Sequence, residues 1–352
     1  LSFEEYGTLH TLYKENFQKF IDYNIKDVQL VERLEEKKKL IEMVVALAYE
    51  AKVNYQDTFG MVMMWEVILA NDLMNRKIVV PPKKDNTKDK AYTGAYVKDV
   101  QTGMHKWVVS FDLNSLYPHL IMQYNVSPET ILTGVTTQTG IEKLLNKEVN
   151  LDKFYEKDIT IAASGQGFKK DVQGFLPRLM QEIYNNRVVF KMKMIDAKQK
   201  YEKETDPKKK EKLAGIADSM KNRQHAMKIM MNSVYGAFGN PYFRFYDLRI
   251  SEAITLGGQL SIRWAETTVN KYLNNVLETK EVDYVLASDT DSLYITLDAL
   301  VNKVFPEDTE TSKIIDFLDK VCEEKITKVI DAGYADLAKY MNAYDQKMFM
   351  KR

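Results

Sequence analysis

Residues 107–118 read Trp-Val-Val-Ser-Phe-Asp-Leu-Asn-Ser-Leu-Tyr-Pro. The first half, which ends at Asp112, is a short apolar run of the kind that forms a buried strand. The segment from Ser115 to Tyr124 has the length and apolar spacing of a helix. Pro118 suits its first turn, because the N–H that proline lacks would be unpaired there. The sequence therefore predicts a strand that ends at an aspartate and opens directly onto a helix.

This junction would place a rigidly held carboxylate beside unpaired backbone N–H groups. The N–H groups near Ser115 and Leu116 begin the helix, where they have no intrahelical partners. Such groups can bind phosphate oxygens. A strand that simply ends in an aspartate is common, so this segment alone does not establish a site.

A second acidic segment, Asp289-Thr290-Asp291, lies between two apolar runs. We expect residues 282–286 and 293–297 to form the strands of a hairpin, with Ser-Asp-Thr-Asp as its turn. Aspartate is frequent in turns for conformational reasons alone. Carboxylates on a rigid scaffold can instead hold a hard cation such as Mg²⁺. One carboxylate from each of two distant segments is what a two-metal phosphoryl-transfer site requires.

Two long helical patterns, residues 179–204 and 210–235, flank a charged break that begins at Asp206-Pro207. So short a connection predicts an antiparallel helical hairpin. Five polar side chains lie on one face of their helix: Arg187 and Lys191 on the first, and Lys228, Asn232 and Tyr235 on the second. If both faces converge, the cations can neutralise a triphosphate and its leaving pyrophosphate. A single cation on a helix is more often a solvated surface charge.

The net charge is zero, so only segregated charge can indicate nucleic acid. Positive charge gathers around the connection between the two long helices, at Lys198, Lys200, Lys203, Lys208, Lys209, Lys210 and Lys212. This cluster is compatible with a solvated surface and with a nucleic-acid contact.

The remaining segments add helices and a linker. Helical spacing recurs in residues 28–34, 40–48, 251–277 and 312–341, a proline-led linker covers 81–86, and residues 131–174 show no clear pattern. The length of 352 residues suggests two or three structural units. One cysteine, Cys322, and four histidines argue against disulfides and a structural zinc. No apolar run is long enough to span a bilayer.

Together the three segments resemble the motifs of family B DNA polymerases in text, order and spacing. Asp112-x-x-Ser115-Leu116-Tyr117-Pro118 resembles motif A, Lys228-x-x-x-Asn232-Ser233-x-Tyr235-Gly236 motif B, and Asp289-Thr290-Asp291-Ser292 motif C. Residues 125–131, 239–247 and 340–350 narrow the resemblance to the replicases of T-even-like tailed bacteriophages. The likeness covers nearly the whole chain.

Two shorter matches and two departures accompany these motifs. Tyr23-x-x-x-Asp27 resembles the third motif of the 3′–5′ exonuclease, and Tyr92-Thr-Gly94-Ala95 resembles the linker motif that contacts template. The family usually has Tyr-Gly before Asp-Thr-Asp, where this chain has Ala287-Ser288, and His119 replaces the usual serine after Tyr-Pro. Neither departure removes an expected metal ligand.

The resemblance implies an α+β fold in which a palm with an antiparallel sheet carries helical-hairpin fingers. The implied parts are an exonuclease remnant with connecting helices (1–83), the first part of the palm (84–173), the fingers (174–240) and the second part of the palm (241–352). The chain begins at Leu1 and ends directly after a helical pattern, so we expect a piece of a longer protein. The thumb and the other exonuclease motifs would lie outside it, and the piece alone would neither proofread nor hold duplex DNA well.

The resemblance also implies an activity, addition of a deoxynucleotide to a primer 3′-OH. Its implied metal ligands for two Mg²⁺ are Asp112, Asp291, the Leu113 carbonyl and, as ligand or positioning group, Asp289. Its implied nucleotide site comprises the N–H groups of Ser115 and Leu116, the side chains of Arg187, Lys191, Lys228, Asn232 and Tyr235, and Tyr117 as a barrier to a 2′-OH. Tyr92 and Gly94 would contact template. Implied partners are primer–template DNA, dNTP, a sliding clamp and other replisome proteins in the cytoplasm of an infected bacterium, with no membrane.

Two other classes stay open at this point. A nucleic-acid- or nucleotide-binding fragment could keep the sheet and yet be inactive alone. A reverse transcriptase or another palm polymerase would not need the Lys-x-x-x-Asn-Ser-x-Tyr-Gly block.

Overall fold

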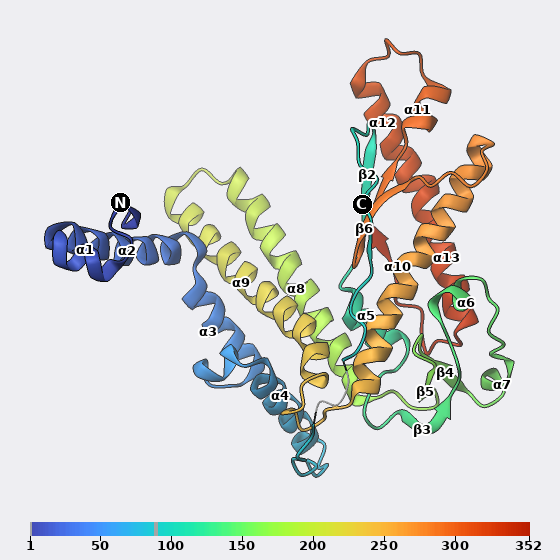
Figure 1. Cartoon of the computed structure of the whole chain (residues 1–352), viewed down its shortest axis with the longest axis horizontal. Helices are drawn as coiled ribbons and strands as arrows, with labels where there is room; N and C mark the ends of the chain where they lie inside the picture. Colours follow the sequence, from blue (N-terminus) through green and yellow to red (C-terminus); the bar gives the residue numbers. More distant parts are fainter. Residues whose placement is uncertain (1, 88–90) are drawn as a thin grey trace. The chain divides into compact units, whose positions relative to one another are not determined.

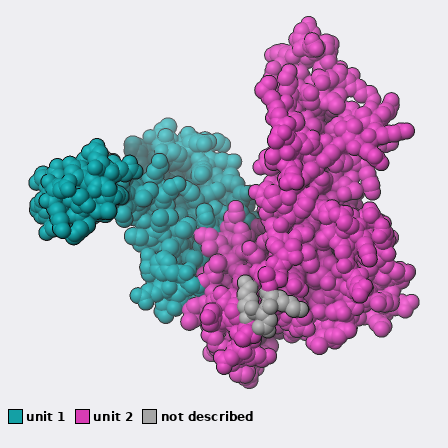
Figure 2. Space-filling model, in the orientation of Figure 1, with its two compact units in different colours: residues 1–60, 187–227 teal, residues 61–186, 228–352 magenta. Residues whose placement is uncertain are grey.

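A computed structural model describes residues 2–87 and 91–352 (Figure 1). The chain forms two compact units, each assembled from two separate stretches of sequence (Figure 2). Unit 1 comprises residues 1–60 and 187–227, and unit 2 comprises residues 61–186 and 228–352. Two long helices, α8 and α9, each contribute residues to both units. The four-part division expected from the sequence stays a prediction.

Unit 1 is helical. Its N-terminal stretch forms α1 (Leu9–Glu15), α2 (Phe17–Lys38) and α3 (Leu40–Ala51), with 3₁₀ turns at Glu4–Tyr6 and Tyr55–Phe59. The second stretch adds part of α8 (Phe175–Lys203) and part of α9 (Pro207–Phe238). The helical hairpin predicted from the sequence is therefore present, and Figure 1 shows its two helices running side by side.

The second helix of this hairpin begins earlier than the sequence pattern predicts. We expected a start near Lys210, with Pro207 acting as a breaker, but α9 begins at Pro207 itself. The Asp206 carboxylate accepts the backbone N–H of Lys208 at 2.9 Å and so caps the first turn. Proline is compatible with the first helical position because its missing N–H would be unpaired there. Pro207 therefore starts the helix instead of ending one.

Contacts between α3 and the α8–α9 hairpin hold unit 1 together. Glu50 on α3 forms an ion pair with Arg223 on α9, and the Arg223 guanidinium lies over the Phe190 ring at 4.2 Å. The predicted α2 helix forms, but within the described residues it buries none of its side chains. Val31, on its apolar stripe, is 67% exposed.

Unit 2 is built around a five-stranded antiparallel sheet with the order β1-β6-β7-β2-β8. Its strands are β1 (Val97–Lys98), β2 (Val108–Leu113), β6 (Val285–Asp289), β7 (Ser292–Thr296) and β8 (Met350–Lys351). The two edge strands, β1 and β8, have only two residues each, which is too short to give a pattern of alternating residues. The sequence therefore predicted the three central strands and missed both edges.

The β6–β7 hairpin differs in register from our expectation. The first strand begins at Val285 and not at Val282, because residues before it are bonded to the helix α10 (Leu248–Leu277). The Asn274 side chain bonds both the N–H and the carbonyl of Val282, at 3.0 and 2.7 Å. Asp289 pairs with Ser292, so the turn itself contains only two residues.

Helices and a second sheet complete unit 2. The helices are α4 (Met61–Asn75), α5 (Leu116–Gln123), α6 (Ile141–Leu145), α7 (Asp152–Tyr155), α10, α11 (Asp298–Val304), α12 (Thr311–Val321) and α13 (Thr327–Tyr340), with a π-helical turn at Cys322–Ile326. The segment without a clear pattern contains a three-stranded antiparallel sheet of β3 (Ile131–Thr136), β5 (Gln166–Lys169) and β4 (Ile159–Ile161), in that order. The α+β class is confirmed. In the described part of the chain, no helix has the length and apolar character needed to cross a bilayer.

Candidate functional site

The antiparallel ladder of unit 2 brings the two predicted acidic segments together. Asp112, near the end of β2, lies opposite Ser292 at the start of β7. Directly beyond this pair, the Leu113 N–H donates to the backbone carbonyl of Asp291 at 2.7 Å. Phe111, which precedes Asp112, is completely buried. The predicted juxtaposition of Asp112 and Asp291 is therefore present, on a strand pair fixed by a buried core.

The turn between β6 and β7 is conformationally demanding. Thr290 has φ +57°, a left-handed conformation that is rare for a β-branched residue. Its N–H donates to the Tyr96 carbonyl at 3.0 Å, and its hydroxyl donates to the Asp289 carboxylate at 3.0 Å. Residues held in this way cost about 1–3 kcal/mol and concentrate at functional sites. The turn fixes Asp291 and occupies the Asp289 carboxylate with a local bond.

The electrostatic environment identifies Asp112 and Asp291 as an interacting pair. Burial raises the pKa of both carboxyl groups, and the negative charge of Asp112 raises the pKa of Asp291 further. Asp289 has a smaller effect of the same sign on the Asp291 pKa, and the Lys228 ammonium acts in the opposite direction on both. Among the described residues no three His, Cys, Asp or Glu side chains gather as a ready metal cluster. Two mutually repelling carboxylates nevertheless fit an oxygen-ligated cation that keeps waters and substrate oxygens.

Helix α5 begins directly beside this pair. Ser115 adopts a left-handed conformation at φ +53° and precedes the first helical residue, Leu116. Pro118 lies in the first turn, as expected. The Ser115 carbonyl accepts the His119 backbone N–H at 3.2 Å and the His119 Nδ1–H at 2.9 Å. The first backbone N–H groups of a helix have no intrahelical acceptor, so this end is suited to phosphate oxygens.

The departure at His119 has a structural explanation. Its imidazole is buried and meets the Tyr184 ring edge-on at 4.8 Å between ring centroids. The Tyr184 hydroxyl also accepts a hydrogen bond from the Asn114 side chain at 2.6 Å. His119 therefore helps to anchor the β2–α5 junction to α8. The other departure from the family motifs is Ala287-Ser288. Ser288 is 1% exposed and lies opposite Lys98 in the β1–β6 strand pair.

A cavity of about 470 Å³ lies in unit 2, and predicted site residues from three separate segments line it. It is lined by Ala91, Tyr92, Gly94, Ala95, Tyr117, Tyr235, Thr255 and Thr290. The Tyr117 and Tyr235 rings are 4.5 Å apart between centroids. The structure thus joins the predicted template-contact residues to the predicted nucleotide residues. Thr255, on α10, was not predicted, because its position in a long helical pattern carries no distinguishing signal.

Glycines allow the rings around this cavity to pack closely. A Cβ on Gly258 would lie 3.2 Å from the Tyr117 ring, and a Cβ on Gly239 would lie 2.6 Å from the Tyr92 hydroxyl oxygen. Burial, followed by the effects of Tyr235, Asp291 and Tyr92, raises the pKa of Tyr117 to about 12. The Tyr117 hydroxyl is therefore neutral at physiological pH and presents a fixed steric surface.

A partly buried ion-pair network holds β1 against the acidic hairpin, and no local sequence pattern indicated it. The Lys98 ammonium, on a side chain only 12% exposed, bonds Glu266 at 2.6 Å and Asp283 at 2.5 Å. Burial alone would lower the pKa of Lys98, but the bonds to Asp283 and Glu266 keep it above its ordinary value. Since β1 follows Tyr96 directly, this network fixes the carbonyl that binds Thr290. The three residues are far apart in the sequence, so no local pattern could reveal them.

The other predicted residues are divided between the units. Lys228, Asn232 and Tyr235 lie on the part of α9 that belongs to unit 2. Arg187 and Lys191 lie on the part of α8 that belongs to unit 1. Their convergence on one triphosphate stays a prediction. Tyr23 and Asp27 are one turn apart on α2, also in unit 1.

Comparison with known proteins gives a consistent set of matches. A model of DNA polymerase family B matches residues 60–325. The DNA-directed DNA polymerase of Escherichia phage RB69 is 32% identical across 98% of this chain, and that of Enterobacteria phage T4 is 29% identical across the same share. A DNA polymerase of Pyrococcus glycovorans is 29% identical across 66% of the chain and 25% of its own length. The chain spans 42% of the length of the two phage relatives.

Proposed function

The chain belongs to DNA polymerase family B, and we propose that it performs template-directed DNA synthesis as the palm and fingers of a phage-type replicative polymerase. The observation that carries this proposal is the Asp112–Asp291 pair, fixed at adjacent strand ends in the same unit as a tyrosine-lined cavity. In the reaction, the primer 3′-oxygen forms a bond to the α-phosphorus of a dNTP and loses its proton. The bond from that phosphorus to the bridging oxygen breaks, and pyrophosphate leaves.

Asp112 and Asp291 are the residues that would hold two Mg²⁺ ions. The Leu113 carbonyl would add an oxygen ligand, and Asp289 would act as a further ligand or a positioning group. Oxygen donors suit Mg²⁺, which normally keeps waters and substrate phosphates among its ligands. When bound, the ions favour the deprotonated 3′-oxygen and neutralise charge on the transferring phosphate. The repulsion that raises the Asp291 pKa would be relieved by this bound positive charge.

The start of α5 and the long helices would bind the triphosphate. Backbone N–H groups of Ser115 and Leu116 would donate to the β- and γ-phosphates. Cationic side chains would neutralise the leaving pyrophosphate, with a neighbouring amide in support: Lys228, Arg187, Lys191 and Asn232. The influence of Lys228 on the pKa of both aspartates supports its place near the reacting phosphate.

The tyrosine-lined cavity would select the sugar and the base pair. Tyr117 would lie under the deoxyribose and exclude a 2′-OH by steric contact, with Tyr235 packed against it. Tyr92 and Gly94 would contact the template strand. Tyr117→Ala should increase ribonucleotide insertion, which can be measured as the ratio of dNTP to rNTP incorporation.

The assignment of parts follows from the same proposal. Residues 84–173 and 241–352 would be the palm, residues 174–240 the fingers, and residues 1–83 the end of an exonuclease region with Tyr23 and Asp27 as a remnant. Primer–template DNA and dNTP would be the direct partners. A sliding clamp and other replisome proteins would join in the cytoplasm of the infected host.

Single-turnover incorporation of one dNTP into a labelled primer–template tests the proposal. Asp112→Asn and Asp291→Asn should each reduce the rate at least about a thousandfold, because each removes a carboxylate that would hold the Mg²⁺ ions, which neutralise charge on the transferring phosphate. The exposed Asp99 provides a matched control, and Asp99→Asn should leave the rate unchanged. Normal incorporation by either active-site variant would refute the metal assignment.

A second candidate function is binding of nucleotide and nucleic acid without catalysis. It is favoured by the fact that the chain spans only 42% of the length of each phage relative. Mg²⁺-dependent dATP binding, measured by calorimetry on the same preparation, distinguishes the two. Binding that depends on Lys228, together with incorporation, supports the polymerase. Binding without any incorporation supports the fragment that is inactive alone.

A further inference from the structure

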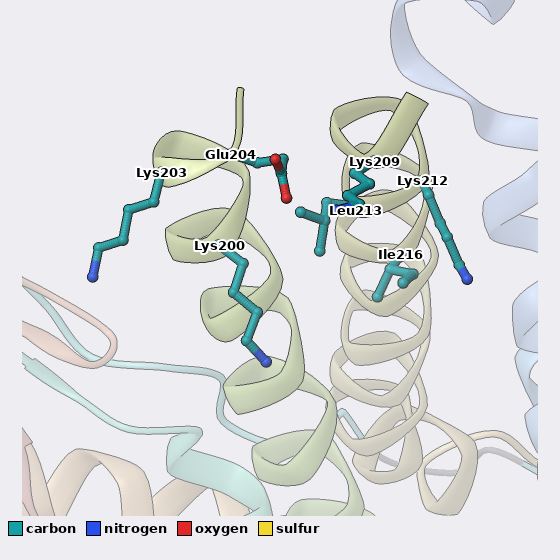
Figure 3. Close-up of a pocket in the computed structure, with 7 residues that line it drawn as sticks. All are labelled: Lys200, Lys203, Glu204, Lys209, Lys212, Leu213 and Ile216. Carbon is teal, nitrogen blue, oxygen red and sulfur yellow. The ribbon is translucent and has the colours of Figure 1, made fainter. Parts of the chain in front are cut away.

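The turn that joins α8 to α9 encloses a pocket of about 480 Å³ that lies entirely within unit 1 (Figure 3). Its lining includes Lys200, Lys203, Lys209, Lys212, Leu213 and Ile216. A seventh residue, Glu204, stands at the end of α8. The pocket therefore contains most of the lysine cluster seen in the sequence, and the proposed polymerase reaction makes no use of it.

The inner surface of this pocket is apolar. Figure 3 shows Leu213 pointing into the space between the two helices, whereas the chains of Lys203 and Lys212 extend away from it on opposite sides. Ile216, one turn along α9 from Leu213, also lines the pocket. Ile216 is 40% exposed. Lysine side chains commonly lay their methylene groups on apolar surface and keep the ammonium group in water. The pocket thus has an aliphatic floor and a rim of lysine stems, and the ammonium groups of Lys203 and Lys212 lie outside it.

Most of the positive charge at the rim has no acidic partner. Lys200 forms an ion pair with Asp196 at 2.7 Å. Lys203, Lys209 and Lys212 take part in no ion pair within the described chain. The one acidic lining residue, Glu204, accepts the backbone N–H groups of Thr205 and Asp206 at 2.9 and 3.1 Å, and these bonds lower its pKa. The Glu204 carboxylate therefore stabilises the turn and neutralises only part of the positive charge of the lysines.

We propose that this pocket binds an acidic peptide segment that carries an apolar side chain. The apolar side chain would cover Leu213 and Ile216, and flanking carboxylates would pair with the lysine rim. Removal of apolar surface from water supplies affinity, and charge complementarity supplies orientation and a faster encounter. The proposal is independent of polymerase activity, because none of the residues that line the pocket has a role in the proposed reaction.

The lining favours a peptide over single-stranded nucleic acid. Sites for single strands combine positive charge with aromatic side chains on which bases stack. Among the described residues, none that lines this pocket is aromatic. The nearby Tyr201 ring is covered by the Lys210 ammonium at 5.2 Å from its centroid. An aliphatic floor of this kind fits a leucine or phenylalanine side chain better than a stacked base.

Fluorescence anisotropy with a labelled peptide, Asp-Glu-Leu-Asp-Phe-Asp-Glu, tests the proposal on the whole chain. The double variant Lys203→Glu with Lys209→Glu reverses two lining charges. Lys198→Glu with Lys208→Glu makes the same charge change on lysines of this cluster that do not line the pocket. We expect the pocket variant, Lys203→Glu with Lys209→Glu, to weaken peptide binding about tenfold or more. The control variant, Lys198→Glu with Lys208→Glu, should weaken it less than about threefold, since ion pairs on an exposed surface are individually weak.

The floor is tested separately from the charge. Ile216→Ser should weaken the peptide about fivefold, and it should not affect a control peptide in which serine replaces leucine and phenylalanine. Equal effects of the two charge variants, or equal binding of the two peptides, would overturn the proposal. So would tighter binding of an oligo(dT) strand with the same dependence on Lys203 and Lys209, which would identify a nucleic-acid site.

Discussion

The acidic hairpin of unit 2 and the lysine-rich turn of unit 1 both concentrate charge, but they hold it in different ways. In the hairpin, Asp112 and Asp291 are placed by paired strands, a buried Phe111 and a strained Thr290. In the turn, the lysines extend from the helices on long side chains, and those of Lys203 and Lys212 point away from the pocket (Figure 3). Strand pairing fixes the position of a carboxylate, whereas an exposed lysine keeps most of its rotamer freedom.

This difference separates two uses of charge. A chemical step requires groups held close to their productive geometry, because small displacements cost large factors in rate. Recognition of a flexible anion requires attraction and a complementary surface, but little precision. Substitutions in the hairpin should therefore affect stability and geometry strongly, and substitutions in the turn should mainly affect affinity.

The largest expected effect is the loss of Phe111, the buried residue that precedes Asp112. Phe111→Ala removes a fully buried ring from β2 and should destabilise unit 2 by about 4 kcal/mol, through lost burial and the cavity left behind. Urea unfolding followed by circular dichroism measures it. Val108→Ala, on the same strand but half-exposed, is the control and should cost about 1 kcal/mol or less. Similar losses for the two variants would contradict a hairpin supported by its core.

A smaller loss is expected at Lys98. Lys98→Met leaves Glu266 and Asp283 without their cation and should cost about 2 kcal/mol, less than a fully buried pair because Asp283 is 43% exposed on its side chain. Loosening of β1 should also speed hydrogen exchange at the Thr290 amide, which donates to Tyr96. Lys303→Met, at an exposed and long ion pair, is the control. Unchanged exchange at Thr290 in the Lys98 variant would show that the network does not position the turn.

The effect of pH on Asp291 should be smaller still. Burial and the charge of Asp112 raise its pKa in the folded state. Stability from this carboxyl is thus fully present below its unfolded pKa and is lost as pH rises through the raised folded pKa. Asp291→Asn avoids this loss, so without Mg²⁺ it should raise the Tm at pH 7. The difference in Tm between Asp291→Asn and the wild-type protein, measured by calorimetry, should shrink as pH falls through the Asp291 pKa. A Tm difference that stays constant from pH 3 to 7 would contradict a raised pKa of Asp291 in the folded state.

The smallest effect is expected in the lysine-rich turn. Ile216→Ala removes a side chain that is 40% exposed and should change the free energy of unfolding by only about 0.5 kcal/mol. Urea unfolding measures this change. Ala217→Leu, at the adjacent buried position, is the matched contrast and should destabilise unit 1 through overpacking. A large loss at Ile216 would mean that the pocket floor belongs to the core and is not a surface for binding.

Local sequence patterns predicted the parts of the site that depend on local structure. The strand ending near Asp112, the helix that follows it and the Asp289–Asp291 turn were all found close to their expected positions. The start of α9 was misplaced because a proline at a capped helix start resembles a proline that breaks a helix. The short edge strands β1 and β8 left no periodic signal.

Long-range contacts account for the rest. Lys98, Glu266 and Asp283 meet only in the folded chain, and so do the residues of the tyrosine-lined cavity. The resemblance to family B predicted Tyr92, Tyr117 and Tyr235 as functional residues, but residue patterns alone did not place them together. Thr255 and the carbonyl of Tyr96 were found only in the structure. A buried position in a long helix has no distinguishing residue pattern, and a backbone carbonyl is the same in every residue.

Binding of Mn²⁺ to the protein, followed by electron paramagnetic resonance, tests the central claim most directly. Mn²⁺ accepts the oxygen ligands that suit Mg²⁺ and reports its bound fraction by loss of the free-ion signal. If the Asp112–Asp291 pair is a cation site positioned by packed strands, Asp112→Asn and Asp291→Asn should each weaken Mn²⁺ binding about tenfold or more. Asp99→Asn should leave it unchanged. Equal Mn²⁺ affinity in the wild-type protein and the two site variants would contradict the account.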